Sequence, residues 1–136
     1  MDVSKYRKDH QDLLAQVELL QGSIQDVKGN IGEIPQLLAQ MSAKLKIHLT
    51  TEDKVLYVNL ASCGNQEAVA LAKTMQTEMG GIKSAWDLYI EKWRISSNII
   101  NDKDTFISET NDIFAALAKR IDSEESTLYD LAAKYA

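Results

Sequence analysis

The chain has 136 residues, of which 45% are apolar, with one proline and six glycines. This length allows one hydrophobic core and is too short for two, so we predict a single domain over residues 1–136. The net charge of −5 and the lack of a basic run argue against nucleic-acid binding. No apolar stretch approaches the roughly 18 residues of a membrane span, and the N-terminal segment lacks the apolar core of a signal peptide. With the single cysteine, Cys63, which excludes an internal disulfide, these features predict a cytoplasmic protein without membrane contact.

Four helices are predicted, because apolar residues repeat at steps of three and four and few helix-breaking residues are present. The predicted ranges are about 4–30, 35–61, 66–95 and 104–136, with a polar loop at 96–102. Gly29-Asn30 and Gly64 end the first two helices, and Pro35 suits the first turn of the second. Short connections make neighbouring helices antiparallel, so the expected fold is an all-α, up-down-up-down four-helix bundle.

One segment occurs twice in the chain. Residues 48–57 (HLTTEDKVLY) recur as residues 120–129 (RIDSEESTLY), with Glu52 and Glu124 at matching positions. Both glutamates fall among core leucines, where a charge is costly unless a metal, a proton or a counter-ion compensates it. The second copy has Arg120 in place of His48. The repeat therefore indicates a polar site inside the bundle, with different chemistry in its two halves.

The polar interruptions of the four apolar stripes are predicted to lie at one height in the bundle. If each helix runs back antiparallel to its neighbour, a rise of 1.5 Å per residue places one set of residues at the same level. That set is His10, His48, Glu52, Met75, Met79, Arg120 and Glu124. The stripe of the second helix is expected to continue through Val55 and Asn59, whereas Asp53 and Glu125 are expected to be surface charges.

These motifs together resemble the hemerythrin-like (HHE cation-binding) family. The resemblance rests on Asp9-His10 with Leu13-Leu14, His48-x-x-x-Glu52 with Leu56-Tyr57, Glu78 before Ile82, and Glu124-Glu125 with Leu128-Tyr129. It implies a four-helix bundle whose core holds a pair of iron ions, bound by histidines and two bridging carboxylates. Proteins of this kind bind or sense oxygen, store iron, or respond to nitric oxide and redox state.

Carried over residue by residue, the resemblance implies His10, His48, Glu52 and Glu124 as metal ligands, with Glu78 or water completing the shell. The third helix has no histidine, and Met75 and Met79 stand at the spacing where the family has one or two. Arg120 takes the place of the histidine expected on the fourth helix, and a guanidinium stays protonated and cannot bind a metal.

Three interpretations follow from this reduced ligand set. In the first, the protein binds one iron or zinc ion, or an asymmetric pair of irons, and serves in oxygen, redox or nitric oxide binding or sensing. In the second, Arg120 replaces a metal, and the metal-free bundle is an interaction or regulatory module. In the third, Met75, Met79 and the stripe Trp86-Tyr89-Trp93 line a pocket for another cofactor, although ordinary core packing is the favoured interpretation of that stripe. No nucleophile–histidine motif or glycine-rich phosphate loop is present, so we expect no enzyme activity.

Overall fold

The computed structural model describes all residues, 1–136, and its regular structure is entirely helical. The α-helices are α1 (Ser4–Ser23), α2 (Ile34–Thr51), α3 (Tyr57–Ala61), α4 (Gln66–Met79), α5 (Ile82–Trp93), α6 (Ser96–Asn101), α7 (Lys103–Ser123) and α8 (Tyr129–Tyr135). A 3₁₀ turn (Ile24–Asp26) follows α1, and π-helical turns join α2 to α3 (Glu52–Leu56) and α7 to α8 (Glu124–Leu128).

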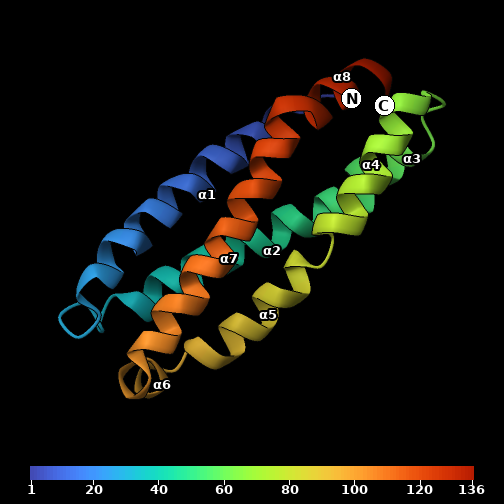
Figure 1. The fold of residues 1–136 in the computed structure, drawn as a ribbon. Coiled ribbons are helices and arrows are strands. Elements are labelled where there is room, and N and C mark those ends of the chain that lie inside the picture. The colour runs from blue at the N-terminus through green and yellow to red at the C-terminus, as the bar shows by residue number, and fades with distance from the viewer.

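These segments form long columns that pack side by side, as Figure 1 shows. The columns are α1, α2 with α3, α4 with α5, and α7 with α8, and each runs antiparallel to the next along the chain. The two termini meet at one end of the bundle, where the Met1 ammonium group donates a 2.6 Å hydrogen bond to the Ala136 carbonyl. The predicted all-α, up-down-up-down four-helix bundle is confirmed.

Local sequence signals explain where the second and third columns begin and turn. Pro35 lies in the first turn of α2, where its missing N–H costs nothing. Gly64 has φ of 82°, a left-handed conformation that glycine adopts without strain. The Asn65 side chain then accepts a 3.0 Å hydrogen bond from the Ala68 amide and caps α4. The predicted end of the second helix near Gly64 is therefore confirmed.

Three predicted boundaries were wrong. The first α-helix ends at Ser23 and continues only as a 3₁₀ turn. The predicted helix 66–95 is broken at Gly80-Gly81, where a Cβ on Gly80 would clash with the Gln76 carbonyl. Residues 96–101, predicted as loop, form α6 because Ile99 is fully buried in the core and anchors this polar turn.

The two π turns occupy equivalent positions in the duplicated segment. In each, the glutamate carbonyl accepts the amide of the residue five positions later, which is Tyr57 for Glu52 and Tyr129 for Glu124. A π turn inserts one extra residue and rotates all that follows. As a result Leu56 and Tyr57 face the core while Val55 is 43% exposed, so the predicted stripe through Val55 and Asn59 was wrong.

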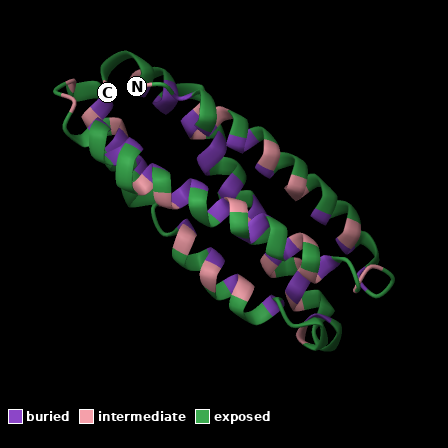
Figure 2. Ribbon diagram, turned by 180° about the vertical axis from the view of Figure 1, so that it is seen from behind, coloured by how far each residue is buried: buried purple, intermediate pink, exposed green.

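The core consists of two apolar clusters on either side of a polar layer. The larger cluster contains Leu13, Leu49, Ile82 and Ile121, and the smaller one contains Tyr6, Leu56, Met75 and Leu128. His10 lies between Tyr6 and Leu13, Glu52 between Leu49 and Leu56, and Glu124 between Ile121 and Leu128, and His48 is one residue before Leu49. Buried residues follow the inner side of every column in Figure 2. No helix has both the length and the apolar character that a membrane span requires.

Candidate metal centre

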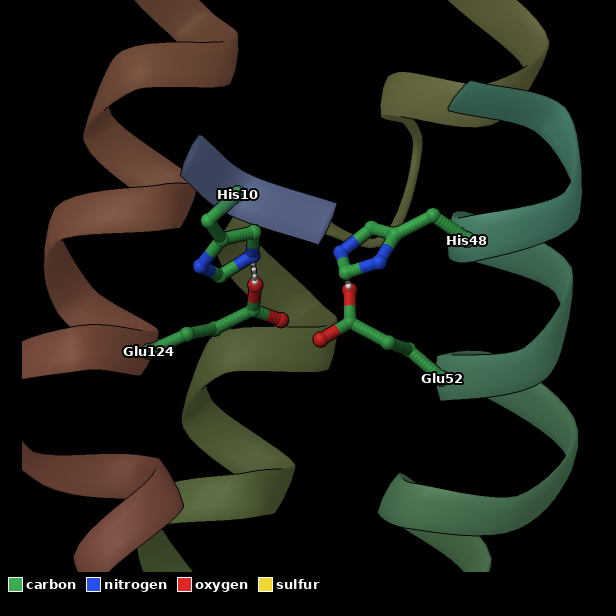
Figure 3. Close-up of side chains that lie close together, drawn as sticks. All are labelled: His10, His48, Glu52 and Glu124. Atoms are coloured by element: carbon green, nitrogen blue, oxygen red, sulfur yellow. Dashed lines mark hydrogen bonds and ion pairs between the residues drawn. The ribbon is translucent and has the colours of Figure 1, made fainter. Parts of the chain in front are cut away.

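Four buried side chains from three columns meet in the polar layer. His10 comes from α1, His48 from the last turn of α2, and Glu52 and Glu124 from the first positions of the two π turns. Each is at most 2% exposed, and one donor atom from each lies within 4.8 Å of the others. Figure 3 shows the His10–Glu124 and His48–Glu52 pairs facing each other across the centre of the bundle.

Both histidines are oriented by carboxylates behind them. His10 Nδ1 lies 2.9 Å from Glu125 Oε1, and His48 Nδ1 lies 3.1 Å from Asp9 Oδ2. A carboxylate accepts a hydrogen bond and cannot donate one, so these contacts place a proton on each Nδ1. They leave Nε2 directed into the layer, which is the arrangement that metal-binding histidines have in proteins.

The Nε2 atoms face further acceptors. His10 Nε2 lies 3.1 Å from Glu124 Oε1, and His48 Nε2 lies 2.9 Å from Glu52 Oε1. The second contact has the distance of an ion pair without hydrogen-bond alignment, so this buried nitrogen has no hydrogen-bond partner. Two lone pairs at this distance repel each other unless a proton or a metal ion lies between them.

Each histidine–glutamate pair has the spacing of two ligands on one metal ion. Two ligand atoms that bind the same ion at right angles, each about 2.1 Å away, are about 3.0 Å apart. The two histidine–glutamate distances, 2.9 and 3.1 Å, have this value. A set of two imidazoles and two carboxylates suits iron and zinc, whereas calcium and magnesium prefer oxygen alone.

Two tyrosines link the halves of the chain by crossed hydrogen bonds. The Tyr57 hydroxyl donates to Glu124 Oε2 at 2.8 Å, and the Tyr129 hydroxyl donates to Glu52 Oε2 at 2.5 Å. Each tyrosine lies five residues after the glutamate of its own copy and binds the glutamate of the other copy. Both tyrosines are at most 2% exposed, and burial raises their pKa values, so they remain neutral donors.

Arg120 enters the same layer from the last turn of α7. Its Nε lies 3.2 Å from Glu124 Oε2, and one terminal nitrogen lies 3.4 Å from Glu52 Oε1 and 3.1 Å from Asp53 Oδ1. The guanidinium is also 5.3 Å from the centre of the Tyr57 ring. Only 2% of the residue is exposed, so a permanent positive charge is buried beside the two glutamates.

The pKa values of the ionisable groups in the layer are shifted in different directions. Burial raises the pKa of Glu52. Burial also acts to raise the pKa of Glu124, but His10 and Arg120 outweigh it and hold that pKa below its ordinary value. The pKa of His48 is lowered by burial and raised more strongly by Glu52 and Asp9, so it lies above the usual value. Without a metal, the layer therefore favours a proton on His48 and a negative charge on Glu124.

The structure brings most of the predicted pocket residues together but not all of them. Met75 is buried in the smaller apolar cluster, and Met79 is half-buried beside it, with its carbonyl 3.4 Å from an Arg120 nitrogen. Glu78, expected to complete the shell, is exposed and lies outside the group. It is one position from Met79 on α4, and a helical step of one residue points it about 100° away.

Two acidic residues predicted as surface charges belong to the site. Asp53 binds Arg120 and Glu125 binds His10, although both are about one-third exposed. The sequence signal that could have found them, together with Tyr57 and Tyr129, is the duplication itself. In both copies the glutamate is followed directly by an acidic residue, and a tyrosine lies five positions after the glutamate.

The aromatic stripe on α5 is ordinary core. Trp86, Tyr89 and Trp93 all belong to the larger apolar cluster, and their polar atoms have partners outside the metal-ligand group. The favoured interpretation of this stripe as core packing is confirmed. Cys63 is a free thiol, partly buried against the smaller cluster.

An antiparallel four-helix bundle with histidine and glutamate side chains directed into its core is the architecture of a metal-binding bundle. Over residues 1–132 the chain matches the sequence model of the Hemerythrin HHE cation binding domain, and it therefore belongs to that family. No match to the chain was found among curated proteins or solved structures. The family and the buried His/Glu group together indicate metal binding.

Proposed function

We propose that this protein binds one iron ion through His10, His48, Glu52 and Glu124 and uses it to bind or sense oxygen, nitric oxide or redox state, without catalysing a reaction. The observation that carries the proposal is the pair of buried histidine–glutamate contacts. His10 and His48 each direct Nε2 at a carboxylate oxygen, at 3.1 and 2.9 Å, and His48 Nε2 has no hydrogen-bond partner. A metal ion bound by these atoms would satisfy both nitrogens and both carboxylates.

The donor set supports iron. Two imidazoles with carboxylates are a common ligand set of non-haem iron, and iron would supply a reversible one-electron change and an affinity for small diatomic molecules. Zinc accepts the same donors but has no redox chemistry. The group has four donor residues, whereas di-iron bundles supply four carboxylates and two histidines, which favours a single ion.

The remaining residues of the layer act on the ligands. Asp9 and Glu125 hold the Nδ1 protons, so that the Nε2 lone pairs stay available. Tyr57 and Tyr129 each donate to one oxygen of a glutamate and leave the other oxygen directed toward a histidine. The apolar clusters above and below exclude bulk water and strengthen every charge interaction within the layer.

Metal analysis of freshly purified protein, expressed with added iron, tests the proposal. We expect about one iron per chain, an absorption spectrum that changes with oxidation state, and loss of most of the metal in His48→Ala. Glu78→Gln is the matched control, because it removes an exposed carboxylate outside the group. Less than about a tenth of an ion per wild-type chain would refute metal binding as its function, and a full complement of zinc would refute the redox role.

A second candidate function is favoured by one observation, the ion pairs between Arg120 and both glutamates. In this case protons on the histidines and the guanidinium compensate the carboxylates, and the metal-free bundle is an interaction or regulatory module. A chelator would then leave the melting temperature of the purified protein unchanged, and added Fe²⁺ or Zn²⁺ would not raise it.

A further inference from the structure

The Arg120 guanidinium is surrounded by oxygen atoms. Three are carboxylate oxygens, from Glu52 at 3.4 Å, Asp53 at 3.1 Å and Glu124 at 3.2 Å. The fourth is the Met79 carbonyl, 3.4 Å from the other terminal nitrogen. This carbonyl is near the end of α4, where the break at Gly80-Gly81 leaves the last carbonyls without their usual helical partners.

The two glutamates separate this oxygen-lined position from the histidines. Glu52 Oε1 contacts His48 Nε2 and an Arg120 nitrogen. Glu124 presents Oε1 to His10 and Oε2 to Arg120. The carboxylates therefore have one side with nitrogen donors and another side with a guanidinium, which amounts to two neighbouring positions for positive charge.

We propose that Arg120 is an internal cation that fills the second of these positions, limits the protein to one metal ion, and masks an all-oxygen site that would otherwise take a hard divalent cation such as Mn²⁺ or Mg²⁺. The three carboxylates and one carbonyl that bind the guanidinium are the ligand types such cations prefer. Only the count of one ion rests on the proposed function. The masked site stands on the contacts of Arg120 alone.

The guanidinium cannot leave this position in the way that a metal ion can. It is attached to α7 by its own side chain, and stacking against the Tyr57 ring adds a further attraction. Burial acts to lower the pKa of Arg120. Glu124 and the other negative groups outweigh burial and hold this pKa above its usual value, so the charge is permanent. A chelator would therefore strip the histidine side and leave the other side compensated.

The test replaces Arg120 by neutral side chains in the full chain. Arg120→Gln keeps a polar group that can donate to the carboxylates, and Arg120→Met is apolar and of similar length. Lys119→Gln is the matched control, because it removes one positive charge from an exposed neighbouring position. Each protein is stripped with a chelator and titrated with Mn²⁺, and bound metal and melting temperature are both measured.

We expect both Arg120 variants to bind one Mn²⁺ more per chain than wild type, and to be destabilised without metal and restored by it. Lys119→Gln should behave as wild type. If a variant does not fold without metal but folds when Mn²⁺ is added, that result also supports the proposal. Equal stoichiometry in wild type and folded variants would overturn it, as would failure of both variants to fold at saturating Mn²⁺.

Failure of the two proposals can be told apart. A wild-type protein without metal, whose Arg120 variants gain Mn²⁺, refutes the iron-binding function and supports the internal cation. A wild-type protein with one iron, whose folded variants gain nothing, supports the function and refutes the internal cation.

Discussion

The crossed tyrosine hydrogen bonds are predicted to contribute a measurable part of the stability. Tyr57→Phe and Tyr129→Phe each remove one hydroxyl and keep the ring, so the apolar packing is preserved. Each leaves a buried glutamate oxygen with one donor fewer. Because a buried acceptor that loses its donor keeps its full desolvation cost, the loss exceeds that of an exposed hydrogen bond.

The expected magnitude follows from the charge on the acceptor. A hydrogen bond to a charged group contributes about 1.5–3 kcal/mol. For a domain of this size, 1 kcal/mol corresponds to about 3–4 °C in melting temperature. Each variant should therefore melt about 5–10 °C below wild type. Tyr129→Phe should lie at the upper end, because its hydroxyl also contacts His10 Nε2 at 2.9 Å.

Two other tyrosines provide matched controls. Tyr135 is 37% exposed, and Tyr6 is buried at 8% exposure, but neither hydroxyl takes part in the crossed pairs. The free energy of unfolding is measured by urea titration of metal-free protein, monitored by circular dichroism. Losses below about 1 kcal/mol for both variants, equal to those of Tyr6→Phe and Tyr135→Phe, would refute the role of the crossed pair.

Three further predictions concern other parts of the molecule. Asp9→Asn should weaken the proposed iron binding about 10–100-fold, because Asp9 orients the His48 ring; an unchanged affinity in equilibrium titrations would contradict this role. Burial lowers the pKa of His48, but Glu52 and Asp9 raise it above the ordinary value. Protonated His48 therefore stabilises the metal-free fold fully below about pH 6.5, and this stability is lost as the pH rises through the raised pKa. The melting temperature should fall over that interval in wild type and much less in His48→Gln, and equal slopes would refute the assignment. Gly64→Ala should cost about 1 kcal/mol in urea titrations, because φ is 82° there, whereas the control Gly22→Ala, with open space around its Cβ position, should be neutral or stabilising.

The sequence predicted the bundle well because its apolar periodicity is strong and its turn residues are few. It also placed His10, His48, Glu52 and Glu124 at one height, and the structure brings them within 4.8 Å of one another. An error of two residues in a helix boundary shifts a side chain by only about 3 Å along the axis. The predicted layer was therefore insensitive to the errors at the helix ends.

The local details failed where the helices depart from regular geometry. Periodicity assumes 3.6 residues per turn, and the π turns after Thr51 and Ser123 break that rule. The extra residue in each π turn rotates Tyr57 and Tyr129 toward the core, so the sequence pattern did not predict that they point inward. Asp53 and Glu125 were missed because one side chain can be partly exposed and still reach a buried partner, which a face-based argument does not consider.

The crossed pairing has a consequence for how the two hairpins depend on each other. Neither half of the chain contains the tyrosine that donates to its own buried glutamate, since Tyr129 donates to Glu52 and Tyr57 donates to Glu124. A hairpin separated from the other would expose its half of the polar layer, and only a second hairpin restores the pairing. Two identical hairpins could associate as a dimer in this way, but both would then carry the same residue at position 48. Joining them in one chain allows one half to keep a histidine there and the other to hold an arginine, so that a single site has two unlike sides.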